Sequence, residues 1–334
     1  MENYVVIDLG SNSVRLRITN IADDGTLTVT HQLKEYVRLS ENMGQEKTLK
    51  QEPIKRTLQA LKSFKDIYSK LENPNVNAIA TAAVRQAANQ KDFLDLVKKK
   101  LDLEFNVITG EREAYLDFLG VTKTLPVKDC LIMDTGGAST ELILAKNGQV
   151  QNLISLPFGS VTISAAHHLD DKISARHLFD AMTSVEKELT NVDWLTEAHK
   201  IPLICLGGSN RTLAKIARRR EFQAANLPEL HGYRLPSDKA FEIVGDLIDM
   251  DKKQRESVPG LAKSRADVVV GGLTPLVLIL RTCHIDEILF SNHGLREGSL
   301  FEYLENKKLN VLDIGYTLSA DTNYAPNLRF FIFC

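Results

Sequence analysis

A short run near the N-terminus decides the fold, because it is repeated later in the chain. An apolar stretch leads into an aspartate and a polar turn in Val5-Val6-Ile7-Asp8-Leu9-Gly10-Ser11-Asn12-Ser13. The same pattern returns 126 residues later, from Asp8 to Asp134, in Leu131-Ile132-Met133-Asp134-Thr135-Gly136-Gly137-Ala138-Ser139. Self-similarity at a fixed offset indicates two copies of one structural unit.

Each copy is predicted to form a β-hairpin. After the turn, apolar residues alternate with other residues at Val14, Leu16 and Ile18 in the first copy, and at Leu142 and Leu144 in the second. Alternation with period two indicates a returning strand. A P-loop or a dinucleotide fingerprint differs, because its glycine turn leads into a helix.

The remaining sequence fits a two-domain α/β protein. A chain of 334 residues with 43% hydrophobic residues is longer than one ordinary core requires. Stretches with helical spacing, such as 52–71, alternate with short apolar strands, such as 77–81. We predict domains at residues 1–125 and 126–305, followed by a tail at 306–334 to which no role is assigned.

Composition and charge exclude several classes of protein. The formal net charge is only -2, so a dedicated nucleic-acid-binding role is not expected. Apolar stretches fall short of the roughly 20 residues that a spanning helix needs, so no membrane association is expected. The N-terminus has no basic region followed by an apolar stretch, and a cytoplasmic location is therefore the expectation.

The two turns have the chemistry of a phosphate site. Glycine and serine turns expose successive N–H groups that can meet phosphate oxygens. Asp8 and Asp134 stand where each strand enters its turn. Such a pair suits Mg²⁺, which needs only one or two carboxylates besides phosphate oxygens and water. Alternatively, each aspartate caps its own turn, but that does not explain why both copies share the residue.

These residues resemble the exopolyphosphatase and guanosine pentaphosphate phosphohydrolase (Ppx/GppA) family, within the actin-like ATPase superfamily. The resemblance covers about residues 4 to 305 and is of the short, two-domain type. It rests on six motifs in family order: Asp8-Leu9-Gly10-Ser11-Asn12-Ser13, Ala80-Thr81-Ala82-Ala83-Val84-Arg85, Thr109-Gly110-Glu111-Arg112-Glu113-Ala114, Asp134-Thr135-Gly136-Gly137-Ala138-Ser139-Thr140-Glu141, Gly207-Gly208-Ser209 and His293-Gly294-Leu295-Arg296-Glu297-Gly298. It implies two actin-like (ribonuclease H-like) α/β domains with an interdomain cleft.

The resemblance also implies catalytic and metal-binding roles. Glu113 matches the family's catalytic base, and it is preferred to Glu111 because the family pattern places the base directly before an alanine. Arg85 matches an arginine that contacts the phosphate being transferred. The implied metal ligands are Asp8, Asp134 and Glu141, with Mg²⁺ as the expected cofactor and Mn²⁺ as the alternative.

Phosphate binding is expected at three glycine-containing turns. The predicted residues are Gly10, Ser11, Asn12, Ser13, Gly136, Gly137, Ala138, Ser139, Gly207, Gly208 and Ser209. Ala138 departs from the family, which more often has a third glycine there. For the last turn, binding through a helix N-terminus competes with simple capping of the helix by Ser209.

The predicted function is that of an exopolyphosphatase, which releases terminal orthophosphate from inorganic polyphosphate by in-line attack of water. Guanosine pentaphosphate is the alternative substrate at the same site. Two further alternatives are a kinase of the same superfamily and a non-catalytic nucleotide-binding module for signalling. The sequence leaves open whether the chain forms a homodimer.

Overall fold

The chain folds into two compact units in this computed structural model, which describes residues 2–44, 46–307 and 316–318. Unit 1 comprises residues 1–109 and 296–334, and unit 2 comprises residues 110–295. The chain therefore passes between the units twice, whereas the predicted domains met once, at 125/126. The segment at 122–128 instead joins a helix and a strand that both belong to unit 2.

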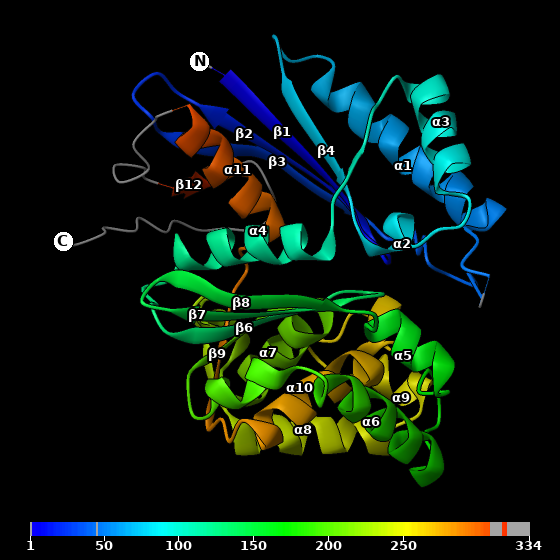
Figure 1. The fold of residues 1–334 in the computed structure, drawn as a ribbon, viewed down its shortest axis with the longest axis vertical. Helices are drawn as coiled ribbons and strands as arrows, with labels where there is room; N and C mark the ends of the chain where they lie inside the picture. Colours follow the sequence, from blue (N-terminus) through cyan, green and yellow to red (C-terminus); the bar gives the residue numbers. More distant parts are fainter. Residues whose placement is uncertain (1, 45, 308–315, 319–334) are drawn as a thin grey trace. The chain divides into compact units, whose positions relative to one another are not determined.

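Unit 1 contains one six-stranded sheet with the order β12-β3-β2-β1-β4-β5 (Figure 1). Its strands are β1 (Glu2–Leu9), β2 (Val14–Ile21), β3 (Leu27–Glu35), β4 (Asn75–Ala80), β5 (Asn106–Val107) and β12 (Tyr316–Leu318). Its helices are α1 (Gln51–Tyr68), α2 (Ala82–Arg85), α3 (Gln90–Leu101) and all of α11 (Leu295–Asn306) but its first residue. Of the predicted tail at 306–334, the described residues are Asn306, which ends α11, Lys307 and the strand β12.

Unit 2 also contains one six-stranded sheet, with the order β10-β11-β9-β6-β7-β8, in which β8-β7-β6-β9-β11 corresponds to β3-β2-β1-β4-β5 of unit 1. Its strands are β6 (Cys130–Thr135), β7 (Thr140–Lys146), β8 (Gln149–Leu156), β9 (Leu203–Gly207), β10 (Arg234–Pro236) and β11 (Glu287–Phe290). Its α-helices are α4 (Gly110–Thr122), α5 (Ser160–Ala166), α6 (Ala175–Leu189), α7 (Gly208–Glu221), α8 (Ser237–Asp249), α9 (Lys252–Arg255) and α10 (Val269–Thr282). Short 3-10 helices lie at Asp193–Ala198, Ala224–Asn226 and Lys263–Arg265.

Both predicted hairpins are present. β1 pairs antiparallel with β2, and β6 pairs antiparallel with β7. In each unit the central strand then pairs in parallel with a later strand, β4 or β9. The common order of five strands confirms the predicted pair of actin-like α/β domains.

The two faces of each sheet are covered differently, and this places the candidate site. In unit 2, alternate residues such as Leu131 and Met133 join the large core shared with α6, α7, α8 and α10. The opposite face packs against α4. In unit 1, residues such as Val5 and Ile7 pack toward α1 and α3, while Tyr4 packs with residues of α11. No helix of the described part of the chain is long and apolar enough to cross a membrane.

Candidate functional site

The two hairpin turns are closed by the same hydrogen bond. The N–H of Gly10 donates to the carbonyl of Ser13 at 3.1 Å, and the N–H of Gly136 donates to the carbonyl of Ser139 at 3.0 Å. A Cβ atom at either glycine would press on that carbonyl, at 3.3 and 3.2 Å. The sequence repeat therefore reproduces the geometry of the turn as well as its residue types.

The carbonyl groups of both turns are held by neighbouring segments. The carbonyls of Ser11 and Asn12 each accept a backbone N–H from the segment 38–40 at 3.0 Å. In the second turn, the carbonyls of Gly136 and Gly137 accept N–H groups from the start of α5 at 2.8–3.2 Å. Because these carbonyl oxygens already accept hydrogen bonds within the protein, the N–H groups are the part of each turn that is suited to bind an anionic oxygen.

The second hairpin places two predicted metal ligands directly opposite each other. Asp134 on β6 pairs with Glu141 on β7, and Glu141 pairs with Ser155 on β8. Their strand neighbours Met133 and Leu142 face the core, so Asp134 and Glu141 point to the α4 face because strand side chains alternate. The hydroxyl of Ser155 donates to Oε1 of Glu141 at 2.8 Å, which fixes this carboxylate.

Helix α4 adds two more carboxyl groups to the same face. Glu113 is half-buried while Glu111 is exposed, in agreement with the prediction that only one of them turns inward. Asp117, one turn further along, is 1% exposed. Burial, and then the charges of Asp134, Glu141 and Glu113, raise the pKa of Asp117 well above its ordinary value. Four carboxyl groups thus share one region of unit 2.

The chemistry of this region fits a hard divalent cation. Two carboxylates directly opposite each other on neighbouring strands repel, and this repulsion needs a cation or a proton to offset it. Among the described residues, no three His, Cys, Asp or Glu side chains converge closely enough to hold a metal ion by themselves. Mg²⁺ does not require three, since it keeps several waters and uses phosphate oxygens. Asp134 and Glu141 are the residues that would hold it.

The first hairpin carries the opposite charge at the equivalent position. Asp8 on β1 pairs with Arg15 on β2, and Nη1 of Arg15 lies 3.9 Å from Oδ2 of Asp8. The offset of 126 residues that relates Asp8 to Asp134 also relates Arg15 to Glu141. Asp8 therefore has a cationic neighbour where Asp134 has a second carboxylate. Its role as a metal ligand stays a prediction, and it needs a metal less than Asp134 does.

Helix α11 adds one positive and one negative group to this region of unit 1. Glu297 forms a buried ion pair with Arg17 on β2. Arg296 is also buried, and burial together with the nearby Arg15 guanidinium lowers the pKa of Arg296. Three guanidinium groups therefore stand against the carboxylates of Asp8 and Glu297. Unit 1 favours an anion at the position where unit 2 favours a cation.

Arg85, the predicted phosphate-contacting arginine, ends the short helix α2 in unit 1. The N–H of Thr81 donates to the carbonyl of Leu9 at 3.1 Å, which joins the start of α2 to the end of β1. Nη1 of Arg85 donates to the carbonyl of Ile108 at 2.9 Å, and the side chain is half-buried. A planar guanidinium group of this kind is suited to bind a phosphoryl group.

The third glycine turn opens helix α7, as predicted, but Ser209 does not cap it. The N-cap is Gly207, with φ of 87°, and no side chain caps the helix. The hydroxyl of Ser209 is buried against Gly272 of α10, so this side chain serves packing. The guanidinium of Arg265 lies against Gly208 and adds positive charge at the start of the helix. This supports anion binding and counts against the capping alternative.

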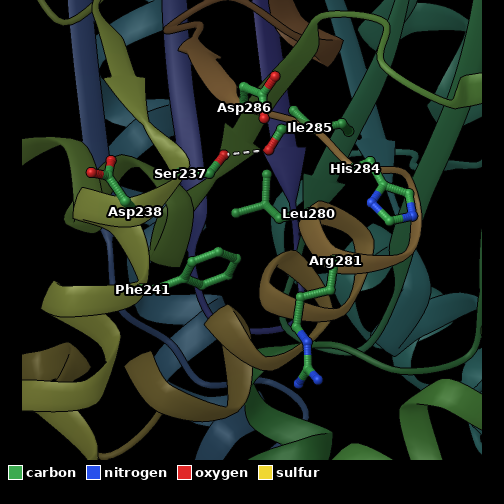
Figure 2. Close-up of a pocket in the computed structure, with 8 residues that line it drawn as sticks. All are labelled: Ser237, Asp238, Phe241, Leu280, Arg281, His284, Ile285 and Asp286. Atoms are coloured by element: carbon green, nitrogen blue, oxygen red, sulfur yellow. Dashed lines mark hydrogen bonds between the residues drawn. The ribbon is translucent and has the colours of Figure 1, made fainter.

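A surface hollow elsewhere in unit 2 lacks these features. It lies between the start of α8 and the end of α10, and Figure 2 shows Phe241 and Leu280 in its lining. The hydroxyl of Ser237 donates to the carbonyl of Ile285 at 2.6 Å. Asp238 and Asp286 line the hollow together with Arg281 and His284, so the lining has no excess of positive groups for a polyanionic ligand. None of the predicted site residues is among its lining residues.

Sequence reasoning missed four charged residues of these regions. Arg15 could have been found by extending the repeat to the end of the returning strand. Asp117 carries a weaker signal, an acidic residue four positions after Glu113 in an otherwise apolar helical face. Arg296 lies within the sixth motif, but no role was predicted for it. Arg265 carries no signal, because its position depends on contacts that are distant in sequence.

Most of the chain is similar to known phosphatases. The Ppx/GppA phosphatase family matches residues 18–307. The chain is 30% identical over 310 residues to a bifunctional 3-dehydroquinate synthase/phosphatase from Fusobacterium nucleatum, covering 90% of this chain and 46% of that protein. It is 29% identical over 306 residues to a guanosine-5'-triphosphate,3'-diphosphate pyrophosphatase from Aeromonas salmonicida, covering 91% and 60%. The chain thus spans about half to three fifths of the length of these relatives.

A solved structure matches over nearly its whole length. The crystal structure of an exopolyphosphatase from Cytophaga hutchinsonii superposes with a TM-score of 0.85 and 26% sequence identity, covering 93% of this chain and 99% of that one. The family match, the shared fold and the six motifs along the chain lead to one assignment, which was predicted from the motifs. The chain belongs to the Ppx/GppA phosphatase family.

Proposed function

We propose that the chain is an exopolyphosphatase that removes terminal orthophosphate from inorganic polyphosphate with the help of Mg²⁺. The observation that carries this proposal is the reversal of charge within the repeat. One structural position holds Arg15 in unit 1 and Glu141 in unit 2, each opposite an aspartate. A phosphate chain with bound Mg²⁺ carries both anionic oxygens and a cation. The hairpin with Arg15 suits the anionic oxygens, and the hairpin with Glu141 suits the cation.

Glu113 is proposed to accept the proton of the attacking water. The side chain is half-buried on the α4 face that also carries Asp117, and a carboxylate is a suitable group to accept a proton from water. Arg85 and the N–H groups of both hairpin turns would hold the reacting phosphoryl group and its neighbours. Bound at Asp134 and Glu141, Mg²⁺ would offset negative charge on phosphate oxygens.

Polyphosphate is preferred as the substrate because the exopolyphosphatase from Cytophaga hutchinsonii matches over its full length. Guanosine pentaphosphate remains the second candidate, because the Aeromonas relative has a name that specifies a guanosine substrate. Both substrates end in a phosphoanhydride, so the same residues would act on either. Recognition of the guanosine base is what would separate the two.

The test measures orthophosphate release from medium-chain polyphosphate, guanosine pentaphosphate and ATP, each with Mg²⁺ and with a chelator. We expect Mg²⁺-dependent release from polyphosphate, and a loss of about 10²- to 10⁴-fold in Glu113→Gln, the range typical of general base catalysis. Glu111→Gln is the matched control, since it changes the exposed neighbour on the same helix. Equal activity of Glu113→Gln and the unchanged chain would remove Glu113 from the mechanism. Faster turnover of guanosine pentaphosphate would select the second candidate.

A further inference from the structure

Asp117 is a buried carboxyl group that the proposed reaction does not use. It lies four residues after Glu113 in α4, and positions with this spacing share one face of a helix. Its Oδ1 atom accepts the backbone N–H of Leu295 at 2.8 Å, in a buried hydrogen bond between residues 178 positions apart. Leu295 is the first residue of α11, where N–H groups lack partners within the helix and must find them elsewhere.

The packing around this hydrogen bond leaves little freedom. A Cβ atom at Gly294 would lie 2.6 Å from Oδ1 of Asp117. A Cβ atom at Gly120, one turn further along α4, would lie 2.4 Å from the carbonyl oxygen of Gly294. The backbone at 294–295 therefore rests directly on α4, and a displacement of one moves the other.

The hydrogen bond also lies at a particular place in the chain. Helix α4 begins at Gly110, the first residue after the chain enters unit 2. Leu295 is the last residue before the chain leaves it. Asp117 thus ties the first helix of unit 2 to the end of the same unit, and Glu113 is one helical turn from this attachment.

Burying a carboxyl group at this position is energetically unfavourable. Asp117 is 1% exposed, and no hydrogen-bond partner of its Oδ2 atom is found among the described residues. Burial, and then the charges of Asp134, Glu141 and Glu113, disfavour a further negative charge here and raise the pKa of this carboxyl group. An apolar residue of the same size would avoid these costs but would leave the N–H of Leu295 without its partner.

We propose that Asp117 is a positioning residue, which fixes α4 to the backbone of Leu295 and thereby sets the location of Glu113. This inference rests on the proposed role of Glu113 as the base. It predicts that an acceptor atom at the Oδ1 position is what matters, and that a negative charge is not needed.

The test compares kcat and KM for orthophosphate release in three variants of the full chain, beside Glu113→Gln. Asp117→Asn keeps the acceptor and the shape of the side chain, so kcat should stay within about twofold of the unchanged chain. Asp117→Leu removes the acceptor, and kcat should fall by about 10- to 100-fold with little change in KM, because a misplacement of ~1 Å can cost about 10²-fold. Gly294→Ala disturbs the same hydrogen bond from the other side and should also lower kcat.

The outcomes separate this inference from the proposed function. If Glu113→Gln is fully active, the proposed base is wrong, whatever the Asp117 variants show. If Glu113→Gln is inactive but a folded Asp117→Leu turns over normally, the positioning role is wrong. Loss of activity in Asp117→Asn equal to that in Asp117→Leu would also overturn it, since it would show that the carboxylate itself is needed. If Asp117→Leu does not fold, Gly294→Ala and Asp117→Asn decide.

Discussion

Neutralising Glu141 should make unit 2 more stable without metal and less responsive to metal. Glu141 is 1% exposed and stands directly opposite Asp134 in the hairpin. Opposed Cβ atoms in such pairs are about 4.5–5.5 Å apart. Two unit charges at about 5 Å repel by about 3 kcal/mol at an effective dielectric constant of 20. Because Asp134 is partly exposed, Glu141→Gln should raise the free energy of unfolding by about 1–3 kcal/mol.

The assay is thermal unfolding followed by the fluorescence of Trp194, the single tryptophan of the chain, which lies in unit 2. For a domain of this size, 1 kcal/mol shifts Tm by about 2–4 °C. In a chelator at pH 8, Glu141→Gln should therefore melt about 2–12 °C above the unchanged chain. Mg²⁺ at 100 times its Kd should stabilise the unchanged chain by about 2.7 kcal/mol and the variant by much less.

The exposed residue Glu111 supplies the control. Glu111→Gln changes the same kind of side chain away from the carboxylate pair, so its effect should stay within about 0.5 kcal/mol. Two results would refute the reasoning. One is a Glu141→Gln variant that is less stable than the unchanged chain in chelator, and the other is equal stabilisation of both by Mg²⁺.

Two further predictions concern buried charges. Glu297→Gln breaks the buried ion pair with Arg17 and should lower the free energy of unfolding by about 3–5 kcal/mol, measured by urea unfolding followed by circular dichroism. The double variant Arg17→Met, Glu297→Met should regain most of this stability. Equal losses of stability in the single and double variants would contradict the prediction. The folded state raises the pKa of Asp117 above the unfolded value of 3.8, so the folded state binds the extra proton, and the stability of the unchanged chain should fall relative to Asp117→Asn as the pH rises above about 4 in chelator. A difference between the two that does not change with pH would show that Asp117 titrates normally.

The sequence predicted the hairpins well, because each rests on a local pattern. The alternation of apolar residues after a glycine turn is visible in the local sequence alone, and both predicted hairpins are present. The third strand of each sheet was missed. In β3, residues 31–35 are exposed, so the strand lacks the alternation of buried and exposed positions that reveals a half-buried strand.

The division of the chain was harder to predict, for a physical reason. The segment at 122–128 is rich in residues that end regular structure, and it does end α4. The end of an element marks a change of unit only when the next element packs elsewhere, and α4 packs on β6, β7 and β8, which follow it. The return of residues 296–306 to unit 1 depends on contacts such as the hydrogen bond between Tyr4 and Ser299. No local sequence pattern predicts such contacts.

The charge reversal at the repeat argues that the two hairpins have become specialised. Turn geometry alone would allow the same residue at both positions, as it does for Asp8 and Asp134. The strands instead carry Arg15 in one copy and Glu141 in the other. Helix α4 adds two further carboxyl groups, Glu113 and Asp117, to the second region, whereas α11 adds Arg296 together with Glu297 to the first. A protein that only needed two stable hairpins would gain nothing from gathering like charges. An anion near the first hairpin and a cation near the second would reduce the repulsion in each region, and the proposed metal-bound phosphate chain carries both charges.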